Sequence, residues 1–225
     1  MRVAIFDLDG TLADTSADLI ASANATLAEL GHPGLLDPVA DRAIAFAGGR
    51  AMLREGLLRA RIAEAGRVDR LYPRLLDLYA AAIAVHTRAY EGAEAALQRL
   101  AAEGWKLGIC TNKPERLALI LIEELGLTRH FAALLGADTL PVKKPDPRHL
   151  LETIARVGGR PERSVLVGDT ITDRDTARAA GVPCVLVGFG PEGGAVSALE
   201  PAAVVAHYDD LPAVLERLVP CAGSG

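Results

Sequence analysis

The chain has 225 residues, of which 50% are hydrophobic and 24% are charged, and its formal net charge is −5. This length and composition indicate a globular protein with one large domain, or one domain with an insert, and they exclude a disordered chain. The acidic balance excludes the basic surface that general nucleic-acid binding requires.

The hydropathy, the N-terminal residues and the cysteine content predict a cytoplasmic protein. No apolar run approaches the 18 or so residues of a transmembrane helix, so we expect no membrane association. The first carboxylate, Asp7, comes too early for a signal peptide. Three cysteines without a C-x-x-C spacing cannot form a disulfide framework, and we interpret Cys110 and Cys184 as buried thiols because they lie in apolar runs.

Short apolar runs alternate with helical patterns along most of the chain. The runs cover residues 3–6, 105–110, 132–136, 164–167, 182–187 and 203–206. Such runs, bounded by turn residues, are typical of strands that are buried on both faces. Helices are expected over residues 92–103, 114–125, 146–157 and 173–180, the third with Asp146 as N-cap and Pro147 in its first turn. The alternation predicts an α/β fold with a doubly wound, Rossmann-like parallel sheet.

Residues 15–88 differ because they contain no convincing strand. A helix is expected from the capping-box-like string Thr15-Ser16-Ala17-Asp18 to Leu30, and further helices around residues 37–46, 50–65 and 68–86. We therefore expect an all-helical cap domain, residues 15–88, inserted after the first strand. The α/β core domain would then comprise residues 1–14 and 89–225.

Polar residues gather at four places that the predicted sheet brings together. They are residues 7–11 (DLDGT), Thr111-Asn112, Lys144-Pro145, and Gly168-Asp169 with Asp173. In an open parallel sheet the working residues lie at the carboxyl ends of the strands. Converging carboxylates raise each other's pKa unless a cation is present, and a set of oxygen ligands favours Mg²⁺. Carboxylates together with a lysine indicate a site for a phosphoryl group.

With these four motifs in order, the sequence resembles the haloacid dehalogenase superfamily in its phosphatase branch. The D-x-D-G-T motif is Asp7 to Thr11, the Ser/Thr motif is Thr111, the lysine motif is Lys144-Pro145, and the G-D-x-x-x-D motif is residues 168–173. Residues 111–114 (TNKP), 143–147 (KKPDP) and 188–190 (GFG) resemble the phosphoglycolate phosphatases within that superfamily.

The resemblance implies a covalent mechanism. Asp7 is expected to attack phosphorus and form an aspartyl-phosphate, and Asp9 to give a proton to the leaving oxygen and later take one from water. Thr111 and Lys144 are expected to bind phosphoryl oxygens. Backbone N–H groups near Leu8 and Asn112 are expected to assist them.

The resemblance also implies a Mg²⁺ cofactor and its ligands. The carboxylates of Asp7 and Asp169 and the backbone carbonyl of Asp9 are expected to hold the ion, with Asp173 nearby or acting through water. Glycine at position 10 would let the chain turn away from the nucleophile. The expected substrate is a small phosphorylated metabolite, 2-phosphoglycolate or a similar ester.

The helical insert is expected to act as a mobile cap that excludes water. No lysine occurs between residues 1 and 104, so the basic residues of the insert are arginines. Arg50, after Gly48-Gly49, is the candidate to bind the carboxylate of the substrate, and a surface arginine at a helix start is the alternative. We expect Lys113 and Lys143 to be solvated loop charges.

The same motifs argue against several other functions. A dehalogenase needs neither a metal nor a second aspartate, so Asp9 and the intact fourth motif argue against it. A phosphonatase or a sugar-phosphate mutase would use a lysine in the insert, where none occurs. A sugar-phosphate phosphatase of the same superfamily stays open. A non-enzymatic regulatory protein on this scaffold should have lost residues of the four motifs, and all of them are present.

Overall fold

The computed structural model describes residues 1–221 and divides into two compact units. One unit comprises Met1–Ala13 together with the chain from Ala89 onward, and we call it the core unit. The other, Asp14–Arg88, is called the helical unit. The two chain crossings between the units carry short strands, β2 (Ala13–Asp14) and β3 (Arg88–Ala89), which pair as a two-stranded sheet that the sequence analysis did not predict.

A six-stranded sheet in the order β5-β4-β1-β6-β7-β8 forms the centre of the core unit. Its strands are β1 (Arg2–Phe6), β4 (Trp105–Cys110), β5 (Ala133–Leu135), β6 (Ser164–Gly168), β7 (Cys184–Val187) and β8 (Ala203–Val205). Every neighbouring pair is parallel, and β1 lies between β4 and β6. The predicted doubly wound parallel sheet is therefore confirmed, and all carboxyl ends of its strands meet at one edge.

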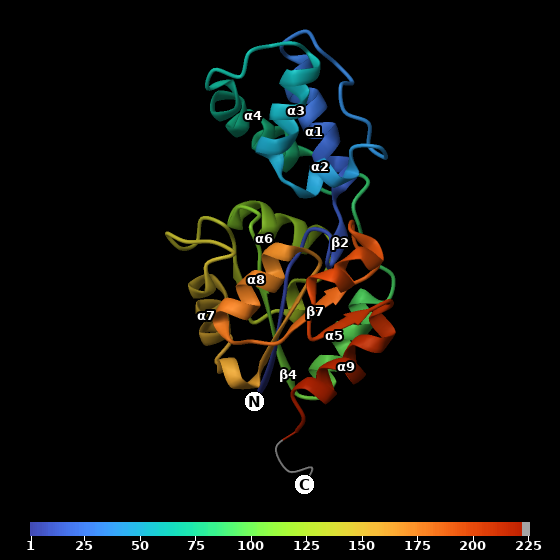
Figure 1. Ribbon diagram of the computed structural model, residues 1–225, viewed down its shortest axis with the longest axis vertical. Coiled ribbons are helices and arrows are strands. Elements are labelled where there is room, and N and C mark those ends of the chain that lie inside the picture. The colour runs from blue at the N-terminus through green and yellow to red at the C-terminus, as the bar shows by residue number, and fades with distance from the viewer. Residues whose placement is uncertain (222–225) are drawn as a thin grey trace. The chain divides into compact units, whose positions relative to one another are not determined.

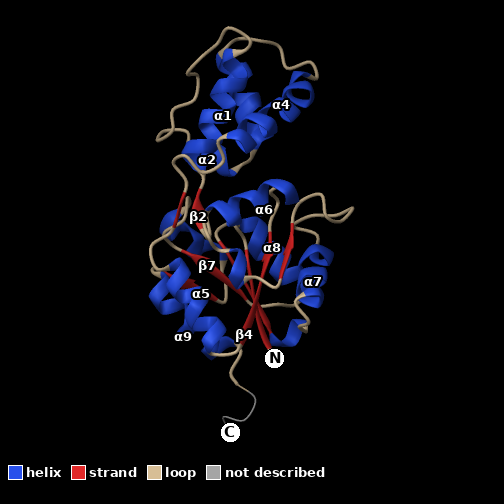
Figure 2. Ribbon diagram, turned by 180° about the vertical axis from the view of Figure 1, so that it is seen from behind, coloured by secondary structure: helices blue, strands red, loops and turns tan. Residues whose placement is uncertain are grey.

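Helices cover both faces of this sheet (Figures 1 and 2). The helices are α5 (Ala93–Ala102), α6 (Glu115–Glu124), α7 (Pro147–Arg156), α8 (Ile171–Ala180) and α9 (Leu211–Leu218). Helices α7 and α8 pack on each other on one side of the sheet, while α5 and α9 pack together on the other. The short 3₁₀ segments are η1 (Thr128–His130), η2 (Pro161–Arg163), η3 (Gly193–Leu199) and η4 (Tyr208–Asp210). Helix α9 was not predicted.

Apolar side chains of the central strands and of α7 form a continuous buried cluster. Val3 and Ile5 of β1 and Leu166 of β6 pack with Leu150 and Ile154 of α7, and all five are fully buried. Burying a side chain of this size contributes roughly 1.5–3 kcal/mol. The sheet is thus a rigid base for the loops at its carboxyl edge.

Two local predictions for the core unit are confirmed. The Asp146 carboxylate accepts a hydrogen bond from Arg148 N at 3.0 Å, so Asp146 caps α7 with Pro147 in the first turn. Cys110 and Cys184 are buried free thiols. Burial raises the pKa of the Cys110 thiol to about 12, so this thiol stays protonated and unreactive.

The helical unit consists of α1 (Ser16–Ala28), α2 (Arg42–Phe46), α3 (Gly49–Arg59) and α4 (Arg67–Ala81). Their facing side chains form one apolar cluster, which includes Ile20, Leu27, Met52 and Leu53. The four helices that the sequence predicts are present, but all four are shorter than expected, the first by the least. The second starts late because the Asp37 carboxylate accepts hydrogen bonds from Val39 N and Ala40 N and holds those residues in a turn.

The predicted capping box at the start of α1 is wrong. Asp14 supplies the oxygen that accepts from Ser16 N at 3.1 Å and from Ser16 Oγ at 2.7 Å. The Asp18 carboxylate accepts instead from His86 N and from both Thr87 N and Thr87 Oγ1, at 2.7–3.1 Å. A long-range contact takes the place of the local one, because a buried carboxylate (Asp18 is 2% exposed) needs several donors.

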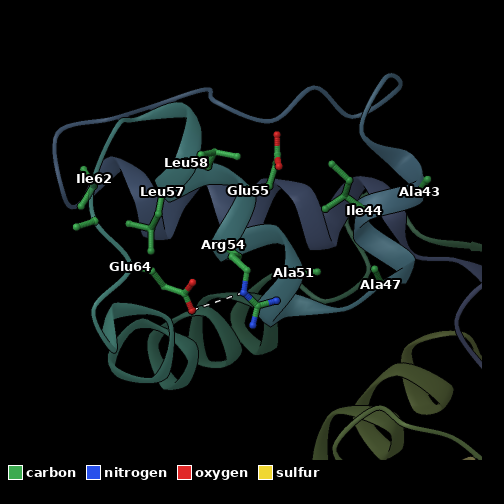
Figure 3. Close-up of a pocket in the computed structure, with 11 residues that line it drawn as sticks. Ala43, Ile44, Ala47, Ala51, Arg54, Glu55, Leu57, Leu58, Ile62 and Glu64 are labelled. Carbon is green, nitrogen blue, oxygen red and sulfur yellow. Dashed lines mark ion pairs between the residues drawn. The ribbon is translucent and has the colours of Figure 1, made fainter.

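A cavity of about 680 Å³ lies within the helical unit, beside α2 and α3 (Figure 3). Its walls are mostly apolar and include Ile44, Leu57 and Leu58, while Arg54 and Glu64 form an ion pair at 3.5 Å along its edge. None of the residues predicted for catalysis, substrate or metal binding lines this cavity. Among the described residues, no helix has both the length and the apolar character needed to cross a membrane.

Candidate active site

Asp7 stands directly after β1, at the carboxyl edge of the sheet. Its backbone N–H donates to Val167 O of the neighbouring β6 at 2.9 Å, which extends the sheet by one residue and fixes the position of Asp7. The two carboxylate oxygens have separate partners: Oδ1 accepts from Leu8 N at 2.7 Å, and Oδ2 lies 3.0 Å from Lys144 Nζ. The carboxylate is therefore held in one orientation.

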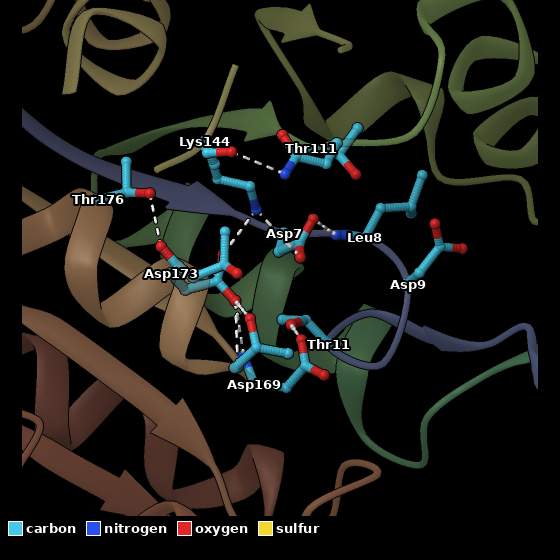
Figure 4. A network of polar contacts seen from close by, with 12 residues as sticks. Asp7, Leu8, Asp9, Thr11, Thr111, Lys144, Asp169, Asp173 and Thr176 are labelled. Carbon is cyan, nitrogen blue, oxygen red and sulfur yellow. Dashed lines mark hydrogen bonds and ion pairs between the residues drawn. The ribbon is translucent and has the colours of Figure 1, made fainter. Parts of the chain in front are cut away.

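Lys144 is the cation at the centre of the polar network in Figure 4. Its Nζ lies 2.6 Å from Asp173 Oδ1 as well as 3.0 Å from Asp7 Oδ2, and its side chain is 1% exposed. Asn112 Nδ2 donates to Lys144 O at 3.0 Å and ties the loop after β4 to the lysine segment. Burial by itself would lower the pKa of the Lys144 ammonium, but the carboxylates of Asp173 and Asp7 outweigh that effect and raise it.

Asp173 is fully engaged by the start of α8. Its Oδ2 accepts from Asp169 N, Thr170 N and Thr170 Oγ1 at 2.8–3.2 Å, which forms a capping box with Thr170 as N-cap. This cap explains why α8 begins two residues earlier than the predicted residue 173. Gly168 permits the arrangement, because a Cβ atom there would lie 2.4 Å from Asp173 Cγ.

Asp169 has one satisfied oxygen and one open one. Its Oδ1 accepts from Thr11 Oγ1 at 2.7 Å, and Tyr208 OH holds the same threonine by donating to Thr11 O at 2.6 Å. Within residues 1–221, Asp169 Oδ2 is buried and has no hydrogen-bond partner. A Cβ atom on Gly10, whose φ is +82°, would lie 2.3 Å from that oxygen. The glycine thus allows the turn after β1 to pass close to the open oxygen of Asp169, whereas the sequence analysis had related this glycine to a turn away from Asp7.

Three carboxylates lie close together at this edge, and Lys144 pairs with two of them, Asp7 and Asp173. Burial raises the pKa of Asp7 to about 6, with Asp173 adding to the effect and Lys144 opposing it. Burial, together with the charges of Asp173 and Asp7, also raises the pKa of Asp169 well above its usual value. Oxygens of the three aspartates lie within 4.8 Å of one another. An oxygen-rich, electron-rich set with one unpartnered buried oxygen fits a hard divalent cation such as Mg²⁺.

Asp9 lies to one side of this cluster (Figure 4). Its carboxylate accepts from Lys113 Nζ at 2.8 Å and 3.1 Å. The prediction that Lys113 is a solvated loop charge is wrong, since its side chain is 3% exposed. A buried ammonium needs a partner, and Asp9 supplies it. Lys143, the other lysine expected to be solvated, is exposed.

Thr111 follows β4 and is 1% exposed. Its N–H donates to Leu135 O at 3.0 Å, and its Oγ1 accepts from Lys113 N at 3.2 Å. Arg50, in contrast, belongs to the helical unit. There it forms an ion pair with Asp69, and its guanidinium lies 4.2 Å from the centre of the Tyr72 ring. The core unit therefore brings together the predicted residues of the four motifs, while the contacts of Arg50 lie within the other unit.

Sequence reasoning missed four residues that shape the site: Thr11, Lys113, Thr170 and Tyr208. Thr11 and Thr170 stand within predicted motifs, and a hydroxyl next to a strand-end carboxylate is a readable capping signal. Tyr208 lies 197 positions after Thr11, and its hydrogen bond is a product of the tertiary fold. No local pattern points to it.

The structure thus brings an aspartate, a lysine and two further carboxylates together at the carboxyl edge of a parallel sheet. Residues 4–187 match the family described as haloacid dehalogenase-like hydrolase. The chain is 46% identical over 223 residues to the phosphoglycolate phosphatase of Mesorhizobium japonicum, covering 98% of both chains. It is 42% identical over 220 residues to that of Agrobacterium fabrum, covering 96% of this chain and 94% of the relative.

Solved structures agree on the fold. A haloacid dehalogenase superfamily hydrolase from Geobacter sulfurreducens has a TM-score of 0.73 at 24% identity, with 96% of each chain covered. A hydrolase from Pseudomonas syringae has a TM-score of 0.75 at 23% identity, with 96% of this chain and 99% of that chain covered. The chain belongs to the haloacid dehalogenase-like hydrolases, and it is a phosphatase.

Proposed function

We propose that this phosphatase hydrolyses 2-phosphoglycolate through an aspartyl-phosphate on Asp7, with Mg²⁺ as cofactor. The observation that carries the proposal is the fixed Asp7 carboxylate at the end of β1, with Lys144 at one oxygen and the open oxygen of Asp169 in the same cluster. An oriented carboxylate beside a cation is suited to attack an anionic phosphate ester, because the positive charge offsets the repulsion between them.

In the first half of the reaction, an oxygen of Asp7 attacks phosphorus, and the bond from phosphorus to the ester oxygen breaks. Asp9 gives a proton to that leaving oxygen, so glycolate departs as a neutral hydroxyl compound at that end. Lys144 and Thr111 bind oxygens of the transferring phosphoryl group. Their position is supported by the hydrogen bonds that tie the lysine segment to Asn112 and Thr111 to the end of β5.

In the second half, water attacks phosphorus of the aspartyl-phosphate and gives a proton to Asp9. The bond between phosphorus and the Asp7 oxygen breaks, which releases inorganic phosphate and restores the carboxylate. The predicted roles of the Leu8 and Asn112 N–H groups toward phosphoryl oxygens belong to both halves. The Leu8 N–H also donates to Asp7 Oδ1 and so orients the nucleophile before substrate binds.

Asp7, Asp169 and the backbone carbonyl of Asp9 would hold Mg²⁺, which when bound neutralises charge on the nucleophile and the phosphate. The unpartnered Asp169 oxygen supports this assignment. Both oxygens of Asp173 already accept hydrogen bonds, from Lys144 and from the start of α8. Asp173 therefore acts near the ion or through a water molecule, and its main task is to hold Lys144 and the Asp169 backbone in place.

The choice of substrate is supported by the names of the curated relatives, which are phosphoglycolate phosphatases at 46% and 42% identity. Residues 15–88 are proposed as a cap that excludes water, with Arg50 as the group that binds the substrate carboxylate. Free buried thiols at Cys110 and Cys184 are compatible with a reducing compartment, so we place the reaction in the cytoplasm.

Acid quenching during turnover tests the covalent step. The wild-type enzyme with phosphoglycolate and Mg²⁺ should yield a phosphorylated peptide that contains Asp7, detected by mass spectrometry. The Asp7→Asn variant should give no phosphopeptide and no more than a few per cent of wild-type turnover, estimated from the weak nucleophilicity of an amide. Chelation of the metal should abolish turnover. Full activity in excess chelator, or retained activity in the variant, would contradict the proposal.

A further inference from the structure

Lys113 forms a close pair with Asp9, and the proposed chemistry gives Lys113 itself no role. The ammonium contacts both carboxylate oxygens, at 2.8 Å and 3.1 Å. The Lys113 side chain is 3% exposed, whereas that of Asp9 is 22% exposed. A lysine so far from water is expensive to bury unless it is paired. The pairing with Asp9 offsets this cost, which leaves the question of what the lysine does for that carboxylate.

The backbone of Lys113 is fixed from three directions. Its N–H donates to Thr111 Oγ1 at 3.2 Å, and its carbonyl accepts from Ala137 N at 2.9 Å. The next residue, Pro114, is the N-cap of α6 with φ −53°. The lysine is thus anchored to the end of β4, to the segment after β5 and to a helix. An anchored ammonium that contacts both oxygens restricts rotation of the carboxylate it holds.

We propose that Lys113 is a positioning residue that fixes the Asp9 carboxylate for proton transfer. The inference rests on the proposed function, because it takes Asp9 as the group that gives a proton to the leaving oxygen. In the first half of the reaction the moving proton is on one Asp9 oxygen, while the other oxygen accepts from Lys113. The bond that breaks is the one between phosphorus and the ester oxygen, and Lys113 keeps its own protons. Fixing the donor removes rotational freedom that would otherwise have to be lost at the transition state.

Leaving groups of different basicity separate this role from a merely structural one. An alkyl oxygen leaves poorly unless it is protonated, whereas 4-nitrophenolate leaves well as an anion. A change that acts through Asp9 therefore slows an alkyl phosphate much more than 4-nitrophenyl phosphate. A general disturbance of the site slows both by the same factor.

The test compares Lys113→Met, which keeps the chain length and removes the charge, with Lys143→Met as a matched control on an exposed lysine. The kcat/KM values are measured with phosphoglycolate, ethyl phosphate and 4-nitrophenyl phosphate at saturating Mg²⁺. Lys113→Met should lose about ten- to a hundredfold on both alkyl esters and less than about threefold on the aryl ester. Lys143→Met should stay within about twofold of wild type on all three.

Ethyl phosphate carries no carboxylate, so a loss confined to phosphoglycolate would make Lys113 a reader of that carboxylate and overturn the positioning role. Equal losses on all three esters would overturn it as well, and so would no loss on any of them. If Lys113→Met does not fold, Lys113→Gln takes its place, and the same ratio of kcat/KM on alkyl and aryl esters is measured. Lys113→Arg keeps the charge and should restore most of the wild-type ratio.

A double-variant cycle separates the failure of this inference from the failure of the proposed function. Asp9→Asn should lose most activity on the alkyl esters, and adding Lys113→Met should lower it by less than about twofold further. Wild-type activity of Asp9→Asn on alkyl esters would contradict the proposed proton transfer by Asp9. Asp9→Asn could instead lose its activity on alkyl esters while Lys113→Met slows 4-nitrophenyl phosphate by the same factor with and without Asp9→Asn. That result would reject the positioning role of Lys113 and leave the proton transfer by Asp9 standing.

Discussion

The core unit and the helical unit use their charged residues in opposite ways. In the core unit, three aspartates and Lys144 are gathered in the interior at the carboxyl edge of the sheet. In the helical unit the helices pack through an apolar cluster, the buried carboxylate of Asp18 has hydrogen-bond donors and, within residues 1–221, no cation, and exposed ion pairs such as Arg74–Glu29 link its helices. Exposed pairs of this kind contribute at most about 1 kcal/mol each, whereas buried charges are strongly stabilising or destabilising according to their partners.

The two units also differ in how they satisfy a buried carboxylate. In the helical unit, Asp18 receives hydrogen bonds from the N–H groups of His86 and Thr87 and from the Thr87 hydroxyl. In the core unit, Asp169 keeps one buried oxygen without a partner among residues 1–221. A buried carboxylate with enough hydrogen-bond donors stabilises the fold. A buried carboxylate with an unpartnered oxygen destabilises the fold until a ligand binds to that oxygen. The predictions below test this contrast.

The largest expected effect is that of Lys144→Met on stability. The change leaves Asp7 and Asp173 buried without their shared cation, which we expect to lower the free energy of unfolding by about 3–5 kcal/mol. Urea unfolding at neutral pH without metal gives this value, and the exposed pair variant Arg74→Met is the control, with a loss below about 1 kcal/mol. Similar losses in the two variants would refute the contrast between the units.

Replacing an aspartate by asparagine should raise the free energy of unfolding in the core unit and lower it in the helical unit. Asp7→Asn removes a carboxylate whose pKa burial raises from 3.8 to about 6, so it should stabilise the metal-free protein by about 1–3 kcal/mol. Asp18→Asn removes a charged acceptor from several donors and should destabilise by about 1–3 kcal/mol. Thermal unfolding in excess chelator checks both signs. A loss of stability in Asp7→Asn would show that the carboxylate stabilises the metal-free fold.

The raised pKa of Asp7 also predicts how stability changes with pH. Because the folded pKa, about 6, lies above the unfolded value of 3.8, the folded state binds the proton more tightly in that window. The contribution of Asp7 therefore lowers stability as pH rises through the window, by about 1–1.5 kcal/mol between pH 5 and pH 8. Free energies of unfolding of the wild type and of Asp7→Asn, both in chelator, isolate this term. Parallel pH curves for the two proteins would contradict it.

The two units also differ in which of their features could be predicted from the sequence. The sheet was predictable, and so was the meeting of Asp7, Thr111 and Asp169, because each directly follows a strand and the strand ends of a parallel sheet meet at one edge. Lys144 lies in the loop nine residues after β5, so its place at this edge was predictable from its motif and not from a strand end. The burial of Lys113 was not predictable, because its exposure depends on the walls that other segments build around it. In the helical unit, the periodicity located the helices but not the long-range role of Asp18, which replaced a plausible local cap.

The smallest expected effect on stability belongs to Arg50→Ala, which tests the carboxylate-binding role proposed for Arg50. Its pair with Asp69 is exposed on both sides, so unfolding should change by less than about 1 kcal/mol. If Arg50 binds the substrate carboxylate, kcat/KM for phosphoglycolate should nevertheless fall roughly ten- to over a hundredfold, the worth of a charge-assisted hydrogen bond. An uncharged aryl phosphate should be little affected. Asp69→Ala is the matched control, since it removes the same ion pair and keeps the guanidinium over Tyr72. Equal losses of Arg50→Ala on both substrates would reject Arg50 as the carboxylate-binding residue and leave the phosphatase chemistry of the core unit untouched.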